Sequence, residues 1–299
     1  MPAYERLVGD TFLLRGSPQA VAYLDGDGTL YIIDPGQGSG RVKSLQKLAR
    51  DLAPKRLVAI VTHFHSDHLE VLARGRPVFD EVHVPEPDAP GVRDPAVRMA
   101  MTFGYPLDAG DEEAMGLPFR APGVEYTHTY KPGGRIGPLE TIPLPGHTPG
   151  HTGVKTPDGV FYAADAIFGP RVLERYLLPY HRDPCMALET ISRIEGLDYE
   201  VLVPGHGPRQ DRGSASELVE ANRRAVESLV ESVESLLGET PRTPGEILER
   251  LAAGRLDPES KPGLVMLLEQ TVRGTLACLA RRGRARPAVT PSGVGWVKP

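Results

Sequence analysis

Short apolar runs, each closed by a turn or a polar residue, recur through the first part of the chain. Runs of this kind are typical of buried strands. Two of them, Leu30–Ile33 and Leu57–Val61, flank a segment whose apolar residues repeat at helical spacing: Val42, Leu45, Leu48 and Leu52. A strand, a helix and a second strand in this order form a right-handed parallel unit. The pattern therefore predicts an α/β domain, which we place at residues 1–212.

The remaining chain changes to helical spacing. It predicts a connecting helix over 213–238, opened by a capping box at Ser214 and Glu217. We expect a small domain over 239–299 after it. The elements predicted for this domain are a short helix capped at Thr243, a helix over Leu264–Ala280 and a hairpin over Ala285–Val297.

At 299 residues, with 40% hydrophobic and 24% charged residues, the chain has the composition of an ordinary globular protein. No apolar run approaches the ~20 residues needed to cross a bilayer, and the first residues do not resemble a signal peptide. We therefore expect a cytoplasmic protein with no membrane partner. The cysteines, Cys185 and Cys278, are too few for a disulfide framework or a thiolate zinc site, so we expect both to be small core residues.

The charge is uneven along the chain. Residues 273–299 contain six basic and no acidic residues, whereas the whole chain has a net charge of −5. Such asymmetry indicates either a tail that faces nucleic acid or an ordinary solvated face, and both interpretations stay open.

Candidate metal ligands are most concentrated in the segment HFHSDH. It starts at His63, just after the apolar run Leu57–Val61. Ligands collect at the carboxyl ends of strands in α/β sheets. Side chains two positions apart point the same way in an extended chain, so His63 and His65 can chelate one ion. Asp67 and His68 follow across the turn and can aim at a second ion. Four such side chains are costly to bury without a metal or other partners.

Three later apolar stretches are each followed by a histidine or an aspartate, at His147, Asp165 and His206. His147 can complete a three-imidazole set with His63 and His65. Because a carboxylate has two oxygens, Asp165 at a strand end can bridge two cations. The recurrence predicts one site built along a single sheet edge.

Other histidines and one aspartate have weaker interpretations. Asp34, which closes a strand, either bonds turn amides or orients a metal-ligating histidine. We interpret His83 as a structural strand residue, His128 as a surface residue, and His151 as a residue that bonds nearby backbone.

The chain also contains candidates for the substrate pocket. Residues 85–123 are rich in proline and glycine but carry large apolar side chains, which favours an irregular cap over the site; a plain surface excursion is the alternative. Residues 124–130 alternate like an exposed edge strand. Tyr176, Tyr180 and His181 follow Asp165 and are candidates for substrate contacts, with ordinary packing as the alternative.

Together these segments resemble the metallo-β-lactamase superfamily: HxHxDH at 63–68, His147 within PGHTPGH, Asp165 closing a strand, and His206 in PGHG. The resemblance implies a four-layer αβ/βα sandwich with metals at one edge of its two sheets. It also implies two metal sites that share Asp165, the first with His63, His65 and His147, the second with Asp67, His68 and His206.

The ligand set looks like that of the glyoxalase II type. The diiron flavoprotein branch carries Glu where this chain has His65, which disfavours oxygen reduction in that style. Imidazole and carboxylate suit Zn²⁺, here two ions per chain, and accommodate Fe or Mn as well. We therefore predict a dinuclear hydrolase in which a metal-bridging hydroxide attacks a small ester, thioester or lactone. Asp67 and His68 are its candidate catalytic residues, since Asp67 would also orient the hydroxide.

The predicted helices and hairpin of the C-terminal part resemble a winged helix, as in a hydrolase branch similar to β-lactamase-like protein 2, some members of which are ribonucleases. One alternative is therefore a metal-dependent endoribonuclease that holds single-stranded RNA through the basic tail. A second alternative is a mononuclear-iron sulfur dioxygenase, whose metal ligands look similar. In the remaining interpretation the small domain is a wall of the active site or a homodimer contact.

Overall fold

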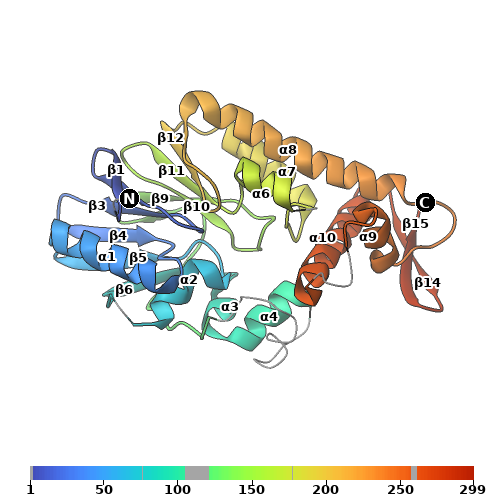
Figure 1. Cartoon of the computed structure of the whole chain (residues 1–299), viewed down its shortest axis with the longest axis horizontal. Coiled ribbons are helices and arrows are strands. Elements are labelled where there is room, and N and C mark those ends of the chain that lie inside the picture. Colours follow the sequence, from blue (N-terminus) through green and yellow to red (C-terminus); the bar gives the residue numbers. More distant parts are fainter. Residues whose placement is uncertain (1–2, 76, 105–120, 177, 257–260) are drawn as a thin grey trace.

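The computed structural model describes residues 3–75, 77–104, 121–176, 178–256 and 261–299. Two β-sheets lie face to face at one end of the molecule, and a largely helical C-terminal part lies at the other (Figure 1). In the first sheet β1 to β4 pair antiparallel and β4 to β7 pair parallel. Its strands stand in sequence order: β1 (Glu5–Val8), β2 (Thr11–Leu14), β3 (Ala20–Leu24), β4 (Thr29–Ile33), β5 (Arg56–Ile60), β6 (Glu81–Pro85) and β7 (His128–Tyr130).

The second sheet is antiparallel except for one parallel pair, β11 with β12. Its strands stand in the order β13 (Gln210–Asp211), β12 (Val201–Pro204), β11 (Val160–Ala164), β10 (Thr152–Lys155), β9 (Leu139–Pro143) and β8 (Arg135–Ile136).

The alternation of side chains in β5 explains how the layers form. Val58 and Ile60 point into the core between the sheets, where Tyr162 and Val203 of the second sheet also lie. Ala59, between them in sequence, belongs to a cluster on the opposite face. A strand that is buried on both faces reads as a continuous apolar run, which is how this one appeared in the sequence.

Helices cover the outer face of each sheet. Helix α1 (Gly38–Leu52) packs Leu45 and Leu48 on the first sheet, and α7 (Pro184–Glu195) with the first half of α8 (Arg212–Ser235) packs on the second. The layers are therefore helix, sheet, sheet, helix, and the αβ/βα sandwich predicted from the sequence is confirmed.

The C-terminal part has a hydrophobic core of its own. The second half of α8 contributes Leu229 and Val233 to it, so this one helix packs on both parts of the molecule. The other elements are α9 (Pro244–Ala252), α10 (Pro262–Arg281), and the paired strands β14 (Arg286–Thr290) and β15 (Gly293–Val297). These elements match those predicted, whereas the domain boundaries and the winged-helix resemblance stay predictions.

Of the two helix caps predicted from the sequence, one is confirmed and the other is wrong. Thr243 caps α9 in a full capping box with Glu246, as expected. The box predicted at Ser214 is absent, because α8 already begins at Arg212 and the Ser214 hydroxyl donates to the Asp211 carbonyl at 3.1 Å.

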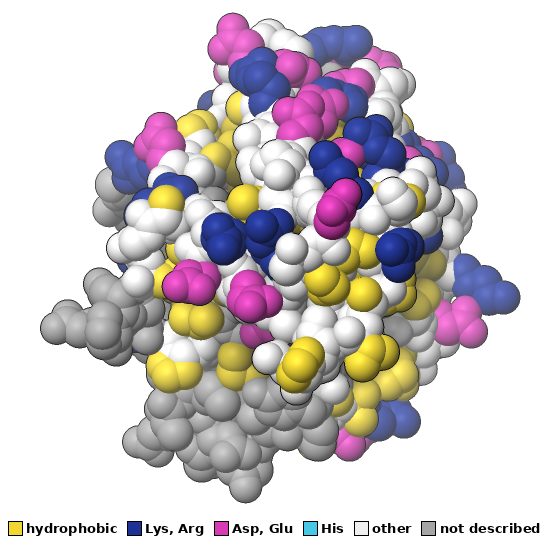
Figure 2. Space-filling view, turned by 90° about the vertical axis from the view of Figure 1, so that its right-hand side faces the viewer, with side chains coloured by type: hydrophobic (Ala, Val, Ile, Leu, Met, Phe, Trp, Pro, Cys, Tyr) yellow, Lys and Arg dark blue, Asp and Glu magenta, His cyan; other side chains and the backbone are white. Residues whose placement is uncertain are grey.

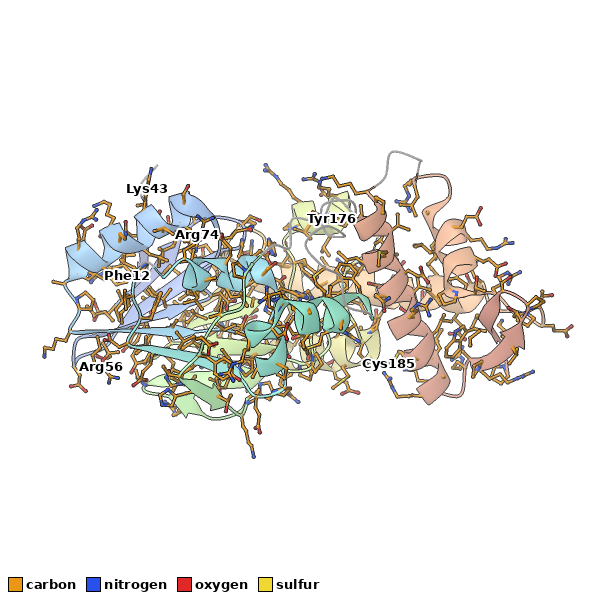
Figure 3. The ribbon with its side chains drawn as sticks, turned by 90° about the horizontal axis from the view of Figure 1, so that it is seen from below. Phe12, Lys43, Arg56, Arg74, Tyr176 and Cys185 are labelled. Atoms are coloured by element: carbon orange, nitrogen blue, oxygen red, sulfur yellow. A yellow bond between two sulfur atoms is a disulfide. The ribbon has the colours of Figure 1, made fainter. Side chains whose placement is uncertain are left out.

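The two cysteines form a disulfide that the sequence analysis did not predict. Cys185 of α7 and Cys278 of α10 are bonded to each other, 93 positions apart in sequence, and Cys185 lies beside the C-terminal helices (Figure 3). The expectation that both are small, buried residues holds for their burial, but the expectation of two unpaired residues is wrong. The bond ties the C-terminal part to the sandwich.

Helix α10 is longer and more apolar than the sequence analysis expected of any segment. By length and mean hydropathy alone its 20 residues could cross a membrane. Its buried side chains, among them Val272, Leu276 and Leu279, instead pack in the C-terminal core. Burial of this kind is typical of a core helix.

The region predicted as an irregular cap contains two helices, α3 (Ala89–Arg93) and α4 (Pro95–Phe103). The Asp94 side chain caps α4 by accepting from the Ala96 amide at 2.8 Å. Residues 105–120 of the predicted cap lie outside the described residues. The strand predicted over 124–130 forms only at its end, as β7.

Candidate metal centre

The candidate ligands follow the carboxyl ends of strands, as predicted. His63 and His65 lie between β5 and α2 (Ser66–Ala73), and Asp67 and His68 are in the first turn of α2. His147 follows β9, and Asp165 and His206 follow β11 and β12. Asp165 comes directly after Ala164, whose φ of 46° is left-handed and turns the chain sharply out of β11.

Four side chains form the first group: His63, His65, His147 and Asp165 each offer an atom within 4.8 Å of the others. His65 Nδ1 lies 3.1 Å from His63 Nε2 and 2.9 Å from His147 Nε2. Asp165 Oδ2 lies 3.5 Å from His147 Nε2. Ligand atoms around a tetrahedral zinc stand about 3.4 Å apart, since each is 2.0–2.1 Å from the ion, so the spacing fits one cation.

The second group contains Asp67, His68 and His206. Asp67 Oδ2 lies 3.1 Å from His206 Nε2 and 3.8 Å from His68 Nε2. Asp165 reaches this group as well, because its Oδ1 is 3.4 Å from His68 Nε2 and its Oδ2 is 3.5 Å from His206 Nε2. One carboxylate therefore stands between both groups, where the sequence analysis placed it.

Most of the imidazoles are fixed through their other ring nitrogen. His68 Nδ1 contacts Asp34 Oδ2 at 2.7 Å, and His147 Nδ1 contacts the Tyr180 carbonyl at 2.9 Å. His63 and His206 contact the hydroxyls of Thr62 (3.0 Å) and Ser17 (2.8 Å) in the same way. Contacts of this kind fix ring orientation and tautomer in metal sites.

Two buried atoms at the junction of the groups, His68 Nε2 and Asp165 Oδ1, have no hydrogen-bond partner among the described residues. Buried polar atoms without partners are rare because they are costly. A cation between the groups would satisfy both atoms. The residues present therefore fit the metals that the sequence resemblance implies.

The electrostatics of the two groups differ. Burial lowers the pKa of His63, His65 and His147, which leaves these imidazoles neutral at neutral pH. Burial acts on His68 and His206 too, but the nearby carboxylates outweigh it, Asp165 most of all, and raise the pKa of both. The first group is thus ready to bind a cation, whereas the second must release protons first.

Asp88 supports the ligand segments, and the sequence analysis missed it. Its fully buried carboxylate accepts from the Phe64 amide (3.2 Å), the Gly150 amide (2.6 Å) and the Thr148 hydroxyl (2.6 Å). It thereby connects the loop after β5 with the loop after β9. Burial raises its pKa to about 6. Asp88 lies in the region predicted to be irregular, where no periodic pattern indicated this role.

The glycines beside two of the ligands, Gly205 and Gly146, leave room for different neighbours. A Cβ at Gly205 would overlap Asp165 Oδ1, so this glycine lets the carboxylate approach. Gly146 has a φ of 133°, and a Cβ there would lie 2.6 Å from the Ala187 amide of α7. Its absent side chain makes room for a helix.

His151 and Asp34 behave as the sequence analysis proposed. The Asp165 amide donates to His151 Nε2 at 3.1 Å, so His151 bonds backbone. Asp34 is fully buried and contacts His68, which is the sharper of its two predicted roles.

A cavity of about 680 Å³ opens onto both groups. His65, Asp67, His147 and His206 lie at its base. Of the three predicted substrate residues, Tyr176 and Tyr180 line it, whereas His181 is buried and does not. Among the described residues of the predicted cap, Thr102 lines the cavity, whereas Met99 and Phe103 pack on α10.

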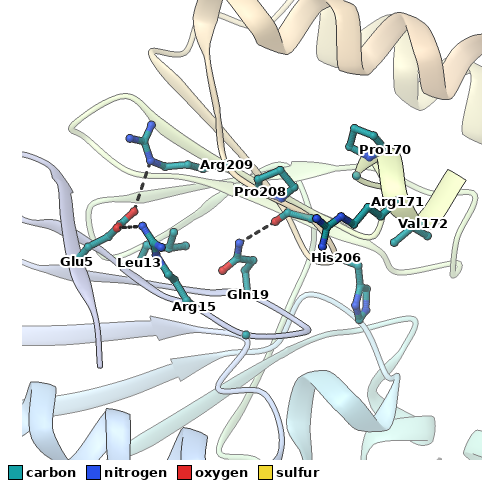
Figure 4. A pocket seen from close by; sticks show the side chains of 13 residues that line it. Glu5, Leu13, Arg15, Gln19, Pro170, Arg171, Val172, His206, Pro208 and Arg209 are labelled. Carbon is teal, nitrogen blue, oxygen red and sulfur yellow. Dashed lines mark hydrogen bonds and ion pairs between the residues drawn. The ribbon is translucent and has the colours of Figure 1, made fainter. Parts of the chain in front are cut away.

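A second recess of about 650 Å³ lies beside this cavity and shares His206, Arg171 and Val172 with it. Two of its three arginines, Arg15 and Arg209, pair with Glu5 (Figure 4). Of the candidate ligands it touches His206 alone, so we take the first cavity as the one that serves the metal centre.

Among the described residues one further metal-type group lies apart from these, formed by Glu81, His83 and His128 of β6 and β7. The two histidines are neighbours across the strands, with rings stacked at 4.6 Å, and His128 is exposed, as predicted.

A family model of the metallo-beta-lactamase superfamily matches residues 14–206, a span that includes every candidate ligand. The chain belongs to the metallo-beta-lactamase superfamily. Solved structures of this superfamily agree on the fold. A beta-lactamase domain protein from Burkholderia ambifaria is 17% identical, with 100% of this chain and 95% of that chain covered and a TM-score of 0.73. A metallo-beta-lactamase family protein from Thermus thermophilus is also 17% identical, with 97% and 99% covered and a TM-score of 0.69.

A third similar structure is that of a protein in a di-iron-bound form. It is 27% identical, with 68% of this chain and 96% of that chain covered and a TM-score of 0.50. No curated protein matches the sequence.

Proposed function

We propose that this superfamily member is a hydrolase that holds two divalent cations and cleaves an ester, thioester or lactone. The observation that carries the proposal is the shared carboxylate, because Asp165 has one oxygen 3.4 Å from His68 and the other 3.5 Å from both His147 and His206. A carboxylate in this position suits a pair of adjacent ions better than a single ion.

The first cation would be held by His63, His65 and His147, and the second by Asp67, His68 and His206. Ligands of nitrogen and oxygen only suit Zn²⁺, which we propose, and accommodate iron and manganese. The similar structure in a di-iron-bound form makes iron the first metal to compare with zinc. When bound, such ions polarise a carbonyl oxygen and make water nucleophilic at neutral pH.

Residues at the base of the cavity would then act on substrate and water. Asp67 lines the cavity and offers an acceptor that would orient the attacking water. The Tyr180 hydroxyl is buried and has no partner among the described residues. Because burial raises its pKa to about 12, it stays protonated and would donate to the substrate carbonyl oxygen.

The ribonuclease alternative has less support. Of the six basic residues in 273–299, three form ion pairs: Arg273 with Glu269, Arg281 with Asp183, and Arg284 with Glu234. Basic and acidic side chains are interspersed on the C-terminal face (Figure 2). Intermixed charge of this kind favours a solvated face over a phosphate-binding surface.

Metal analysis combined with a substrate panel tests the proposal. We expect two metal ions per chain and hydrolysis of ester, thioester or lactone, with both lost in Asp165→Ala and His147→Ala. One iron per chain with oxygen consumption on a persulfide would instead indicate the sulfur dioxygenase. Cleavage of single-stranded RNA without activity on any carbonyl substrate would indicate the nuclease.

A further inference from the structure

The cavity over the metal centre has an apolar wall. Leu264, Leu267 and Leu268 of α10 line it, and so do Val172 and Leu173 of α6 (Pro170–Arg175). The volume of about 680 Å³ lies within the range of small-molecule sites. Apolar side chains that face a cavity favour an apolar ligand group, because its burial removes further surface from water.

The outer part of the same cavity is cationic. Arg171 and Arg175 of α6 and Lys261, which precedes α10, line it and are exposed. Within the described part of the chain none of the three forms an ion pair. Asp67 is the one carboxylate in the described lining, and it belongs to the candidate metal centre.

The neighbouring recess provides a contrast within the same molecule. Arg171 lines both the cavity and the recess, and the other two arginines of the recess, Arg15 and Arg209, pair with Glu5 (Figure 4). The arginines that line the recess alone thus have a carboxylate partner, whereas the cations of the cavity have none among the described residues. Cations left without carboxylates beside an apolar wall favour a ligand that brings its own negative charge.

We propose that the substrate is an amphiphilic anion: an acyl thioester or ester whose acyl chain packs on Leu264, Leu267 and Leu268. Its leaving group carries a phosphate or carboxylate that Arg171, Arg175 and Lys261 bind. This inference rests on the proposed hydrolase function. The bond between the acyl carbon and sulfur or oxygen breaks, water supplies hydroxyl to the acyl carbon, and the remaining proton goes to the leaving group.

The site geometry supports an acyl substrate over RNA. The cavity that opens onto the candidate ligands has an apolar wall, where a ribose-phosphate chain would place polar groups without partners. Beyond Arg171 the neighbouring recess contains Arg15 and Arg209, but both are paired with Glu5 and so are not free to bind successive phosphates.

Kinetics with matched substrate pairs test the inference on the metal-loaded protein. One pair is hexanoyl-coenzyme A and the neutral N-acetylcysteamine thioester of the same acid; the other is a 4-carboxyphenyl and a plain phenyl hexanoate. We expect kcat/KM to be at least tenfold higher for the anionic member of one pair, which identifies phosphate or carboxylate as the charged group. Hexanoyl substrates should also exceed acetyl substrates at least tenfold.

Matched variants show where the preference arises. Arg171→Gln with Arg175→Gln should remove the preference for the anion, chiefly through a higher KM for the anionic substrate. Leu264→Asn should reduce the dependence on chain length. Arg209→Gln is the control, because it removes a cation from the neighbouring recess and should leave the preference intact.

A binding measurement separates this inference from the hydrolase proposal. Calorimetry with the non-hydrolysable thioether analogue of hexanoyl-coenzyme A should show binding that weakens at least tenfold in the double arginine variant and with added salt. Equal rates for charged and neutral substrates would overturn the inference while the hydrolase proposal stands. Tighter binding of a single-stranded oligonucleotide than of the analogue would also overturn it. Binding of the analogue without hydrolysis of any substrate would instead count against the hydrolase.

Discussion

His68 and Asp34 are both fully buried, and His68 Nδ1 lies 2.7 Å from Asp34 Oδ2. Asp34 also accepts from the Thr62 amide at 2.8 Å and the Thr62 hydroxyl at 2.6 Å. It therefore fixes the His68 ring and, with it, the direction of the unpartnered Nε2.

Asp34→Asn tests this role. Asparagine tolerates the left-handed φ of 49° at this position but offers one acceptor oxygen in place of two. We expect metal content to fall from two ions toward one and activity to fall about 10–100-fold, as is usual for such supporting residues. Metal analysis beside the activity assay measures both. The control is Asp158→Asn, which changes a carboxylate that accepts hydrogen bonds from the Asp10 amide and the Thr11 hydroxyl. Equal metal content in the two variants would contradict the role of Asp34.

The pKa shifts predict the order in which protons displace the metals. Carboxylates raise the pKa of His68 and His206, whereas burial lowers the pKa of the three imidazoles of the first group. As pH falls, protons should therefore compete first at His68 and His206 of the second group. Metal titrations across pH 5–8 should show two sites at the upper end and one at the lower. Simultaneous loss of both ions would contradict the difference between the groups.

Gly205→Ala should disrupt the centre without touching a ligand. The added Cβ would overlap Asp165 Oδ1, which must move. We expect loss of the second metal and most activity in a protein that still folds, as judged by circular dichroism. The control is Gly213→Ala in α8, where a Cβ meets no other atom; alanine should be neutral or slightly stabilising there.

Tyr180→Phe removes the buried hydroxyl but keeps the ring beside His65 and His147. The backbone carbonyl that holds His147 is unchanged. We expect two metals to remain and kcat to fall roughly tenfold, the loss of about one hydrogen bond to the reacting group. If metal content falls together with kcat, Tyr180 has a structural role instead.

The disulfide between Cys185 and Cys278 should stabilise the fold. Because its ends are 93 positions apart in sequence, it removes unfolded-state entropy worth about 4.6 kcal/mol in the chain-entropy model. The double alanine variant should lose free energy of unfolding of this order in urea melts. The denatured, unreduced wild type should have no reactive thiol. Two reactive thiols there would contradict the bond.

The sequence predicted the metal centre well because its evidence is local. His63, His65, Asp67 and His68 lie within six consecutive positions, and each distant ligand follows an apolar strand, so sheet geometry alone brings them to one edge. Which residues support the ligands was harder to predict. Asp88 lies in a stretch without periodicity, and nothing near Gly205 in sequence indicates that its neighbour in space is Asp165.

Contacts between distant helices could not be predicted at all. The partner of Cys185 depends on how α10 docks on α7, where the Asp183 carboxylate also binds Arg281 at 2.6 Å. The apolar wall of the cavity depends on the same docking. Helical spacing in 264–280 predicted a helix, but its side chains could face a core, a partner or a substrate, and periodicity does not distinguish these.

Asp165 should lie between two cations in the metal-loaded protein. Anomalous diffraction from crystals of that form measures this. We expect two peaks about 3.5–4 Å apart on either side of Asp165, one among His63, His65 and His147 and the other among Asp67, His68 and His206. A single peak away from Asp165, or none at full metal loading, would contradict it.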